Sequence, residues 1–359
     1  MKIECQERTR HDCLQILDGR DGALDPLRQS ELVVVGGTGF VGTWIAEMVS
    51  ALNDAYQFDI KLSLISRSTD QFSNRLSHLA SRSDITLIKS DVRQLGQFPP
   101  NADWVIHAAA NPDVRSHASN PLNTASVIVD GAMSVMRTAE RLSRLQKLLY
   151  LSSGLVCGPQ PESVTGIQES AQGAPAPDAS FIYPNAKRFA ETLCSAARAQ
   201  SRIPVLVARP FSFIGPYQSL DNPWAQTTFL ADALRGHQIR VNGDGQVVRS
   251  YLYGSDAAYW FLRILTAGQS GDVVNVGSPV GITLQDLAKE VSKNFSSAPD
   301  ILLNTSPRTA GRSIQLLPDT THAQNDYGLS VFTQLEDAVK LTAQWHLLQN
   351  NKLDSNRAR

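Results

Sequence analysis

This 359-residue sequence has few cysteines and no long hydrophobic run. Its four cysteines, Cys5, Cys13, Cys157 and Cys194, form no CxxC pair and no other metal-ligand spacing, so we expect isolated thiols without a disulfide, a redox centre or a metal site. No apolar stretch approaches the roughly 18 to 20 residues that span a bilayer, and the polar start Met1 to Arg10 lacks the apolar core of a secretory signal. These absences favour a cytoplasmic protein that does not partner a membrane.

The sequence also lacks an excess of either charge. Lys and Arg number 33 and Asp and Glu 34, which gives a formal net charge of -1. Because no global basic field attracts a polyanion, we expect no nucleic acid as a partner. A small anionic ligand held by a local cationic pocket fits this balance better. With 42% hydrophobic and 19% charged residues, the chain has the composition of an ordinary globular protein.

What the sequence does contain is a regular alternation of apolar, strand-like runs with helical patterns. The runs are Leu32 to Val35, Ile60 to Ile65, Ile85 to Lys89, Trp104 to Ala108, Leu148 to Ser152 and Val205 to Ala208. A long helix is predicted from Pro121 to Leu145, where apolar residues recur at helical spacing. Such alternation predicts the α/β class, with a doubly wound parallel sheet covered by helices on both faces.

The most informative motif is the turn after the first run, Gly36 Gly37 Thr38 Gly39 Phe40 Val41 Gly42. Glycine lets such a turn close and lets backbone N–H groups approach a diphosphate without interference from a Cβ atom, while the next helix directs its positive end at the anion. The turn therefore predicts a dinucleotide site in a Rossmann-type fold. A glycine-rich surface turn is the alternative.

We predict four parts along the chain. Residues 1–30 form an N-terminal extension of unassigned role, and residues 31–215 form the NAD(P)-binding Rossmann domain. Residues 216–349 form a smaller C-terminal α/β substrate-binding lobe that returns some strands to the Rossmann sheet, and residues 350–359 form a polar tail that frays. Within the lobe, Asn242 to Gly245 is predicted to turn between strands. Pro159 to Pro177 is predicted to be a surface loop beside the site.

A second motif pairs Tyr183 with Lys187, four residues apart at the head of a predicted helix. A phenol with an ordinary pKa of about 10 is a poor base at neutral pH, but a neighbouring ammonium favours the phenolate. Ser153 follows the fifth run at the carboxyl edge of the sheet, where its hydroxyl can hydrogen-bond the reacting oxygen. Because Pro184 disfavours helical dihedrals in the residue before it, we expect Tyr183 to cap the helix instead of sitting in its first turn.

With these motifs in their order, the sequence resembles the extended short-chain dehydrogenase/reductase family, in its NAD-dependent epimerase/dehydratase (nucleotide-sugar) type. The likeness covers roughly Glu31 to Trp345. Besides the glycine turn, the segments that carry it are Asp91 Val92, His107 to Ala110, Ser152 to Gly158, Tyr183 to Lys187, Ala208 to Phe211, and Gly243 to Gly245 with Arg249.

The resemblance implies roles for individual residues. Ser153, Tyr183 and Lys187 take the catalytic positions, and Lys187 also binds the nicotinamide ribose. Substrate contacts are implied at Ser153, at Ser212 and at Arg249, which grips the diphosphate. Asp91 takes the place of the residue that holds the adenine amino group. The implied cofactor contacts are Gly36, Thr38, Gly39, Phe40, Val41, Gly42, Ser66, Arg67, Asp91, Val92, His107, Ala108, Ala109, Tyr183, Lys187 and Pro210.

The implied reaction is hydride transfer at C4 of a nucleoside-diphosphate sugar, assisted by the tyrosine, lysine and serine, as in an epimerase. Gly154 and Leu155 stand where the 4,6-dehydratase branch carries an acidic pair, so we do not expect elimination of water by that mechanism. One alternative is a reductase that uses NADPH on a 4-keto sugar. Another is a non-catalytic, dinucleotide-sensing regulatory protein.

The cofactor is predicted to be NAD or NADP, with a preference for NADP. After the second run stand Ser66, Arg67 and Ser68, without the acidic residue that accepts hydrogen bonds from both ribose hydroxyls of NAD. Arg67 and Arg75 are then available to a 2′-phosphate. The alternative is that these arginines are solvated and that the protein binds NAD. The resemblance also implies a homodimer, built from the helix Pro121 to Leu145 and the helix that carries Lys187.

Overall fold

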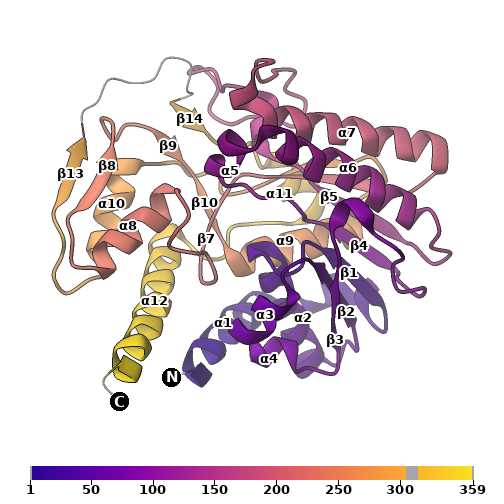
Figure 1. Cartoon of the computed structure of the whole chain (residues 1–359), viewed down its shortest axis with the longest axis horizontal. Helices are drawn as coiled ribbons and strands as arrows, with labels where there is room; N and C mark the ends of the chain where they lie inside the picture. The colour runs from indigo at the N-terminus through magenta and orange to yellow at the C-terminus, as the bar shows by residue number, and fades with distance from the viewer. Residues whose placement is uncertain (1, 305–313, 358–359) are drawn as a thin grey trace.

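A computed structural model describes residues 2–304 and 314–357 of the chain (Figure 1). At its centre lies a parallel sheet of seven strands in the order β11-β6-β5-β4-β1-β2-β3. These strands are β1 (Glu31–Val35), β2 (Lys61–Ser66), β3 (Ile85–Lys89), β4 (Trp104–His107), β5 (Lys147–Leu151), β6 (Val205–Pro210) and β11 (Val273–Val276). The six predicted runs coincide with β1 to β6, and the doubly wound α/β fold is confirmed.

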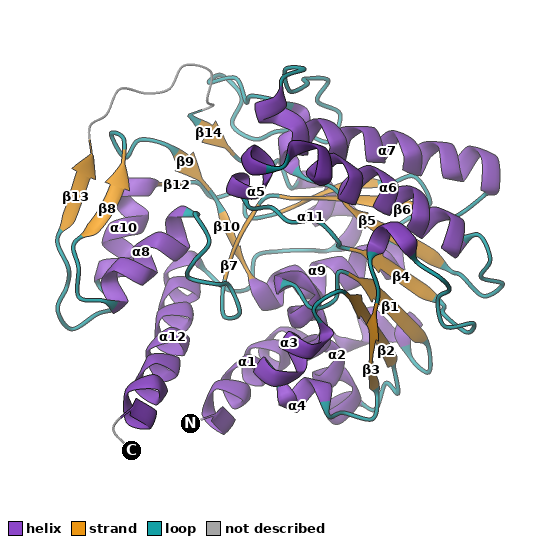
Figure 2. Cartoon of the chain, in the orientation of Figure 1, coloured by secondary structure: helices purple, strands orange, loops and turns teal. Residues whose placement is uncertain are grey.

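Helices cover both faces of this sheet (Figure 2). On one face lie α1 (Lys2–Leu17), α2 (Phe40–Tyr56) and α9 (Gly254–Ala267), and on the other α6 (Pro121–Ala139) and α7 (Ile182–Ser201). Successive side chains of β1 point to opposite faces, so Leu32 and Val34 belong to the first core, whereas Val33 and Val35 belong to the second. Since both faces are buried, the strand needs the unbroken apolar run that identified it.

The long helix α6 ends at Ala139, six residues before the predicted end at Leu145. The chain must reverse here to begin β5, and Asp103 holds the reversal. Its carboxylate pairs with Arg144 at 3.0 Å, and its backbone carbonyl accepts the N–H of Gln146 at 2.7 Å. Leu145 remains half-buried against the core as part of this connection, which accounts for its apolar character outside a helix.

The N-terminal segment is folded onto the body of the protein. Besides α1 it contains a 3-10 turn, η1 (Asp21–Leu27). Three side chains of α1 bind residues more than 200 positions away: Arg8 donates to Gln344 at 2.6 Å, Thr9 hydrogen-bonds Tyr217 at 3.0 Å, and Asp12 accepts the Tyr253 hydroxyl at 2.7 Å. The helix therefore joins the N-terminus to the second half of the chain.

Among the strands that the structure describes after β6, β11 joins the main sheet and the others form three small sheets. The sheets pair β7 (Ser212–Ile214) with β10 (Tyr251–Tyr253), β8 (Ile239–Asn242) with β13 (Ile301–Asn304), and β9 (Val248–Arg249) with both β12 (Ile282–Thr283) and β14 (Gln315–Leu316). The turn at Gly243 and Gly245, both with positive φ, connects β8 to β9 in different sheets. Helices α8 (Ala225–Leu234), α10 (Leu284–Ser292) and α12 (Leu335–Arg357) support these sheets.

Helix α12 continues through most of the segment expected to be a polar tail. It reaches Arg357, and residues 358 and 359 lie outside the described part of the chain. The sequence from Leu335 to Arg357 contains no glycine or proline that would end a helix. Among the helices that the structure describes, none is both long and apolar enough to cross a membrane.

The buried carboxyl group of Asp12 yields a stability prediction. Burial raises its pKa from 3.8 to about 6. Because the folded-state pKa is the higher one, this group contributes stability below pH 4 and loses it as the pH rises through about 6. Asp12→Asn keeps an acceptor for Tyr253 without the charge, so we expect it to stabilise the protein by roughly 1–2 kcal/mol at pH 8 and to change little at pH 4.

Thermal melts of the wild type and Asp12→Asn at the two pH values check this. Asp18→Asn, at an exposed position just after α1, is the matched control and should leave both melting temperatures unchanged. An Asp12→Asn protein that melts lower at pH 8 would contradict the expectation.

Candidate active site

The carboxyl ends of the central strands lie level with one another. In the parallel ladders Val35 pairs with both Ile65 and His107, and His107 pairs with Tyr150. The loops that leave β1, β2, β4 and β5 therefore meet at one edge of the sheet. The reversal of strand order between β1 and β4 falls at the same edge, which is where doubly wound folds bind ligands.

The glycine turn after β1 has the backbone geometry of a cradle. Gly36 has φ of +85°, and a Cβ there would lie 2.6 Å from the backbone nitrogen of Ala109. A Cβ at Gly42 would lie 2.3 Å from the carbonyl oxygen of Gly37. Gly39 caps α2, whose first N–H groups have no acceptor within the helix and carry no acidic side chain beside them. This arrangement fits the pyrophosphate of a dinucleotide.

Beside the cradle, the end of β2 carries hydroxyl and guanidinium groups. Thr38 donates its hydroxyl to Ser66 at 2.7 Å, and an Nη of Arg75 lies 3.5 Å from the carbonyl oxygen of Thr38. Arg67 is largely exposed, with its guanidinium 3.9 Å from the carboxylate of Asp91. Two cationic side chains therefore lie near the end of β2, where the ribose of a bound dinucleotide would be held.

Asp91 is ionised and already paired. It begins the short 3-10 turn η2 (Val92–Gln94), where its carboxylate accepts the backbone N–H of Arg93 at 2.9 Å and its guanidinium at 2.7 Å. The Arg93 side chain is the main reason that the pKa of Asp91 falls to about 2. The neighbouring Val92 is buried against Gly131 of α6, so the turn is packed onto the second core.

His107 closes β4 beneath the cradle. It is 1% exposed, and its Nε2 has no hydrogen-bond partner among the described residues. Burial lowers its pKa to about 3, so the imidazole is neutral at physiological pH. The next residue, Ala108, donates its N–H to the carbonyl of Val35 at 2.7 Å, and Ala109 follows it against Gly36. These contacts bring the His107 to Ala109 segment and the glycine turn together.

Ser153, Tyr183 and Lys187 come together at this edge. Ser153 follows β5 and begins the 3-10 turn η3 (Gly154–Cys157), and its hydroxyl group lies close enough to Tyr183 to lower the pKa of that phenol. Lys187 lies one helical turn after Tyr183 on α7, with its Nζ 5.9 Å from the centre of the Tyr183 ring. The same Nζ donates to the carbonyl of Leu151 at 2.6 Å. A phenol, an alcohol and an amine therefore share one buried environment.

Burial sets the protonation states of this group. It raises the pKa of Tyr183 to about 12, against the opposing effect of the nearby Ser153 hydroxyl, and lowers the pKa of Lys187 to about 7. Without a ligand the phenol is therefore protonated at neutral pH, and the amine lies near its midpoint. A ligand that stabilises the ammonium would also favour the phenolate, because the two groups are close enough to interact electrostatically.

The expectation that Tyr183 caps its helix is wrong. Helix α7 begins at Ile182 after the turn η4 (Ala179–Phe181), so Tyr183 is its second residue and Pro184 its third. A proline is tolerated in the first turn because the N–H it lacks would have no acceptor there. Tyr183 and Lys187 consequently keep the full i, i+4 relation of a regular helix.

The predicted substrate residues lie further along the chain. Pro210 ends β6 and the half-buried Ser212 begins β7, so both remain near the carboxyl edge of the main sheet. Arg249 lies on β9 in the separate three-stranded sheet, where its guanidinium donates to the carbonyl of Val248 at 2.7 Å. The structure therefore puts Arg249 in a different sheet from the strands that carry Ser153 and the cofactor cradle.

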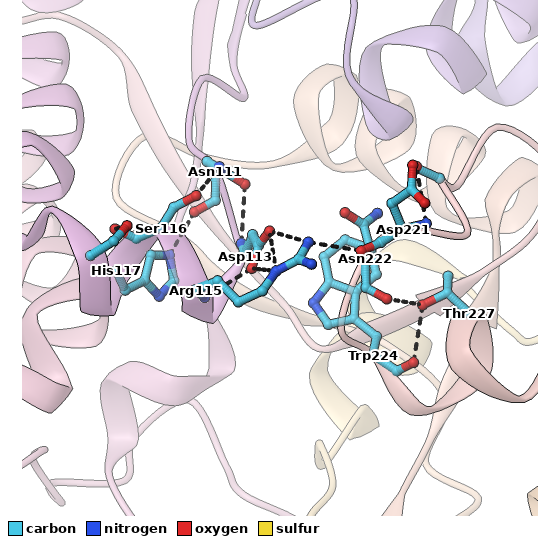
Figure 3. Close-up of polar contacts among 11 residues, drawn as sticks. Asn111, Asp113, Arg115, Ser116, His117, Asp221, Asn222, Trp224 and Thr227 are labelled. Carbon is cyan, nitrogen blue, oxygen red and sulfur yellow. Dashed lines mark hydrogen bonds and ion pairs between the residues drawn. The ribbon is translucent and has the colours of Figure 1, made fainter. Parts of the chain in front are cut away.

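One residue at this edge was missed in the sequence. His117 lies on α5 (Val114–Ser119), between β4 and α6, and its ring stacks on that of Tyr183 with centroids 4.5 Å apart and planes 11° from parallel. Figure 3 shows His117 with its neighbours Asn111, Asp113 and Arg115. A signal was available, since the segment directly follows the predicted cofactor loop at a carboxyl strand end, where functional side chains gather.

Across the residues that the structure describes, no group of three or more His, Cys, Asp or Glu side chains is arranged to hold a metal ion. The four cysteines are buried, and none of them forms a disulfide with another described residue.

Comparison with known proteins agrees with this architecture. The sequence model of the NAD dependent epimerase/dehydratase family matches residues 32–277. The chain is 26% identical over 328 residues to UDP-glucuronic acid decarboxylase 6 of Arabidopsis thaliana, covering 88% of this chain and 90% of that protein.

Two solved structures share the fold. UDP-N-acetylglucosamine 4-epimerase from Methanobrevibacter ruminantium, solved with UDP-N-acetylmuramic acid, has a TM-score of 0.78 and 22% identity, covering 90% of this chain and 99% of the other. UDP-glucuronic acid 4-epimerase from Bacillus cereus, solved with UDP-glucuronic acid and NAD, has a TM-score of 0.77 and 20% identity, covering 89% and 99%.

The close approach at Gly36 can be tested by substitution. Gly36→Ala adds both backbone strain and a clash with Ala109. We therefore expect the free energy of unfolding to fall by at least about 2 kcal/mol, and we expect nicotinamide-dinucleotide binding to be lost. Denaturant unfolding and calorimetric titration with NAD measure the two effects.

Two other glycines serve as controls. Gly19 also has positive φ but has no atom within 4 Å of an added Cβ, so Gly19→Ala isolates the strain, at about 1 kcal/mol. Gly96 has open space and no positive φ, and Gly96→Ala should be silent. If Gly36→Ala behaves like Gly19→Ala and still binds NAD, the cradle interpretation is wrong.

Proposed function

Because the chain belongs to the NAD-dependent epimerase/dehydratase family, we propose that it is an enzyme that oxidises C4 of a nucleoside-diphosphate sugar. The observation that carries the proposal is the convergence of Ser153, Tyr183 and Lys187 at the edge where the glycine cradle opens. A non-catalytic dinucleotide sensor would have no use for this buried acid–base group.

Each of the three side chains has a distinct role in the step. The phenolate oxygen of Tyr183 accepts the proton of the C4 hydroxyl as the C–H bond at C4 breaks and a C4 ketone forms. The Ser153 hydroxyl hydrogen-bonds the same sugar oxygen and orients it. The Lys187 ammonium favours the phenolate. When bound, the nicotinamide cofactor supplies the hydride acceptor.

The residues that would hold this cofactor surround the cradle. The backbone from Gly36 to Gly42 would take the pyrophosphate, Asp91 and Val92 would border the adenine, and the His107 to Ala109 segment would line the dinucleotide. Lys187 would bind the nicotinamide ribose, and Pro210 at the end of β6 would close the nicotinamide end.

The fate of the C4 ketone depends on the sugar. If the ketone is re-reduced on its other face, the product is the C4 epimer. If C5 carries a carboxylate, the ketone makes it a β-keto acid, which can lose carbon dioxide; the similar proteins of Arabidopsis are named as UDP-glucuronic acid decarboxylases. Elimination of water by an acidic pair is not proposed, because Gly154 and Leu155 occupy those positions. Ser212 and Arg249 are proposed to contact the substrate, the arginine through the diphosphate.

A second candidate is an NADPH-dependent 4-keto-sugar reductase. It is favoured by Arg67 and Arg75 near the end of β2, where a 2′-phosphate would be placed. It is also favoured by Ser66, which stands at the end of β2 in place of an acidic residue. For the same reason we propose NADP as the preferred cofactor.

We also propose a homodimer that pairs α6 and α7 with the same helices of a second copy. These two helices pack on each other along one face of the sheet, and α7 exposes the large apolar side chain of Phe189. Size-exclusion chromatography with light scattering tests this, and a monomer that persists at micromolar concentration would contradict it.

The substrate can be found by screening. We expect one of the UDP-, dTDP-, GDP- and CDP-sugars to raise the melting temperature in the presence of NAD or NADP, since a ligand that binds only the folded state stabilises it. Absorbance at 340 nm and mass spectrometry of the products then separate the reactions. Cofactor retained through purification with no net reduction indicates an epimerase, whereas consumption of added NADPH with a keto sugar indicates the reductase.

The role of Tyr183 is tested by removing only its hydroxyl. Tyr183→Phe should lower kcat by about 10²- to 10⁴-fold, because it removes the proton acceptor, while dinucleotide binding is kept. Tyr259→Phe, in α9 on the opposite face of the sheet, is the matched control. Full activity in Tyr183→Phe would refute the proposed mechanism.

The cofactor preference is tested at the two arginines. The double change Arg67→Ala, Arg75→Ala should weaken NADP binding by about tenfold or more and leave NAD binding within about twofold, because only NADP carries the 2′-phosphate. Arg235→Ala, an exposed arginine after α8, is the control. Equal losses for both dinucleotides would argue against the phosphate site.

A further inference from the structure

His117 is held on the ring of Tyr183 by its own element. Its Nε2 lies 2.7 Å from the carbonyl oxygen of Asn111, which fixes Nε2 as the protonated nitrogen in the neutral ring. The side chain of Asn111 donates to Ser116 at 3.0 Å, and Asp113 caps the helix through the N–H of Arg115 at 2.9 Å. The imidazole is buried, so the stack is a packed contact and not a surface encounter.

The same helix is tied to the second half of the chain. The guanidinium of Arg115 pairs with Asp113 at 2.7 Å and donates to the carbonyl of Asp221 at 2.8 Å (Figure 3). Asp221 belongs to the loop that leads into α8, and this loop is itself held where Thr227 donates to the carbonyl of Asn222 at 2.8 Å. α5 thus joins the Tyr183 ring to the C-terminal part of the molecule.

We propose that His117 is a positioning residue for Tyr183: its imidazole fixes the plane of the phenol ring, and Arg115 holds α5 in the place that makes this possible. The importance of this for turnover rests on the proposed function, whereas the effect on the phenol itself does not. Because the two rings are stacked face to face, the Tyr183 ring cannot tilt without losing contact with the imidazole, so its hydroxyl stays near Ser153.

Several titratable or charged groups border the pair. Lys187 lies on α7, Tyr150 comes from β5, and Asp113 and Arg115 are paired with each other on α5. Two elements that pack against α5 add acids with partners of their own: Asp178, ahead of η4, binds Ser180, and Asp130 of α6 binds Ser126. A His117 variant keeps all of these groups, so a shift in the pKa of Tyr183 reports on the loss of the imidazole.

The direct test follows the phenol by NMR. Protein labelled with ¹³C at the tyrosine ζ carbon is titrated with pH, and Tyr183 is assigned from the spectrum of Tyr183→Phe. In His117→Ala water replaces the imidazole, so we expect the pKa of Tyr183 to fall by about one unit. His117→Phe restores a ring and should return it toward the wild-type value. Arg115→Ala should also lower the pKa of Tyr183, by a smaller amount than His117→Ala does.

Kinetics provide the second readout. Once a substrate is identified, His117→Ala should lower kcat by about tenfold to a hundredfold and leave KM for the sugar within about twofold. It should also shift the rising limb of the pH profile of kcat to lower pH. His117→Phe should recover most of kcat. His237→Ala, an exposed histidine in the C-terminal part, is the control and should match the wild type.

The outcomes separate this inference from the proposed function. If folded His117→Ala leaves the Tyr183 titration unchanged, or if His117→Phe is no better than His117→Ala, the positioning role is refuted. If Tyr183→Phe keeps full activity while the titration still responds to His117, the proposed mechanism fails and the contact between the two rings stands.

Discussion

The level register of the parallel strands is the constraint on which the site depends. Because β1 pairs in step with both β2 and β4, Val35, Ile65 and His107 lie side by side near the carboxyl edge of the sheet. A slip of one position on β1 would turn each of its buried valines to the opposite core. Two apolar cores thus hold a polar edge in place.

At that edge the burial that assembles the group also suppresses its ionisation. Tyr183 and Lys187 are both desolvated, so the phenol holds its proton and the amine readily loses one. In place of water, the Lys187 amine donates a hydrogen bond to the carbonyl of Leu151. Burial therefore opposes the ammonium and the phenolate alike, and a ligand that favours either charge also favours the other.

Much of this architecture could be predicted from the sequence, and the misses have physical reasons. Both faces of the sheet are buried, so the strands appeared as unbroken apolar runs. The glycine turn could be identified because Gly36 meets the backbone of Ala109 too closely for any side chain. The end of α6 was misplaced because Leu145 is apolar for packing against the core and not for a helix.

The position of Tyr183 and the role of His117 were harder to predict. The residue before a proline is usually extended, but a preceding 3-10 turn lets Tyr183 enter the helix. The stack of His117 on Tyr183 joins residues 66 positions apart, and no periodicity announces such a contact. The residue roles taken from the resemblance, and the preference for NADP, stay predictions.

The docking of α1 has a consequence for the order in which the protein folds. Arg8, Thr9 and Asp12 bind partners at positions 344, 217 and 253, whereas Thr9 also contacts Glu47 of α2, so only part of the surface on which α1 packs lies near it in the sequence. Contacts of such long range are slow to form, since the intervening loop must close before they gain anything. We therefore expect the contacts of α1 with the second half of the chain to form late in folding, after the Rossmann strands have paired.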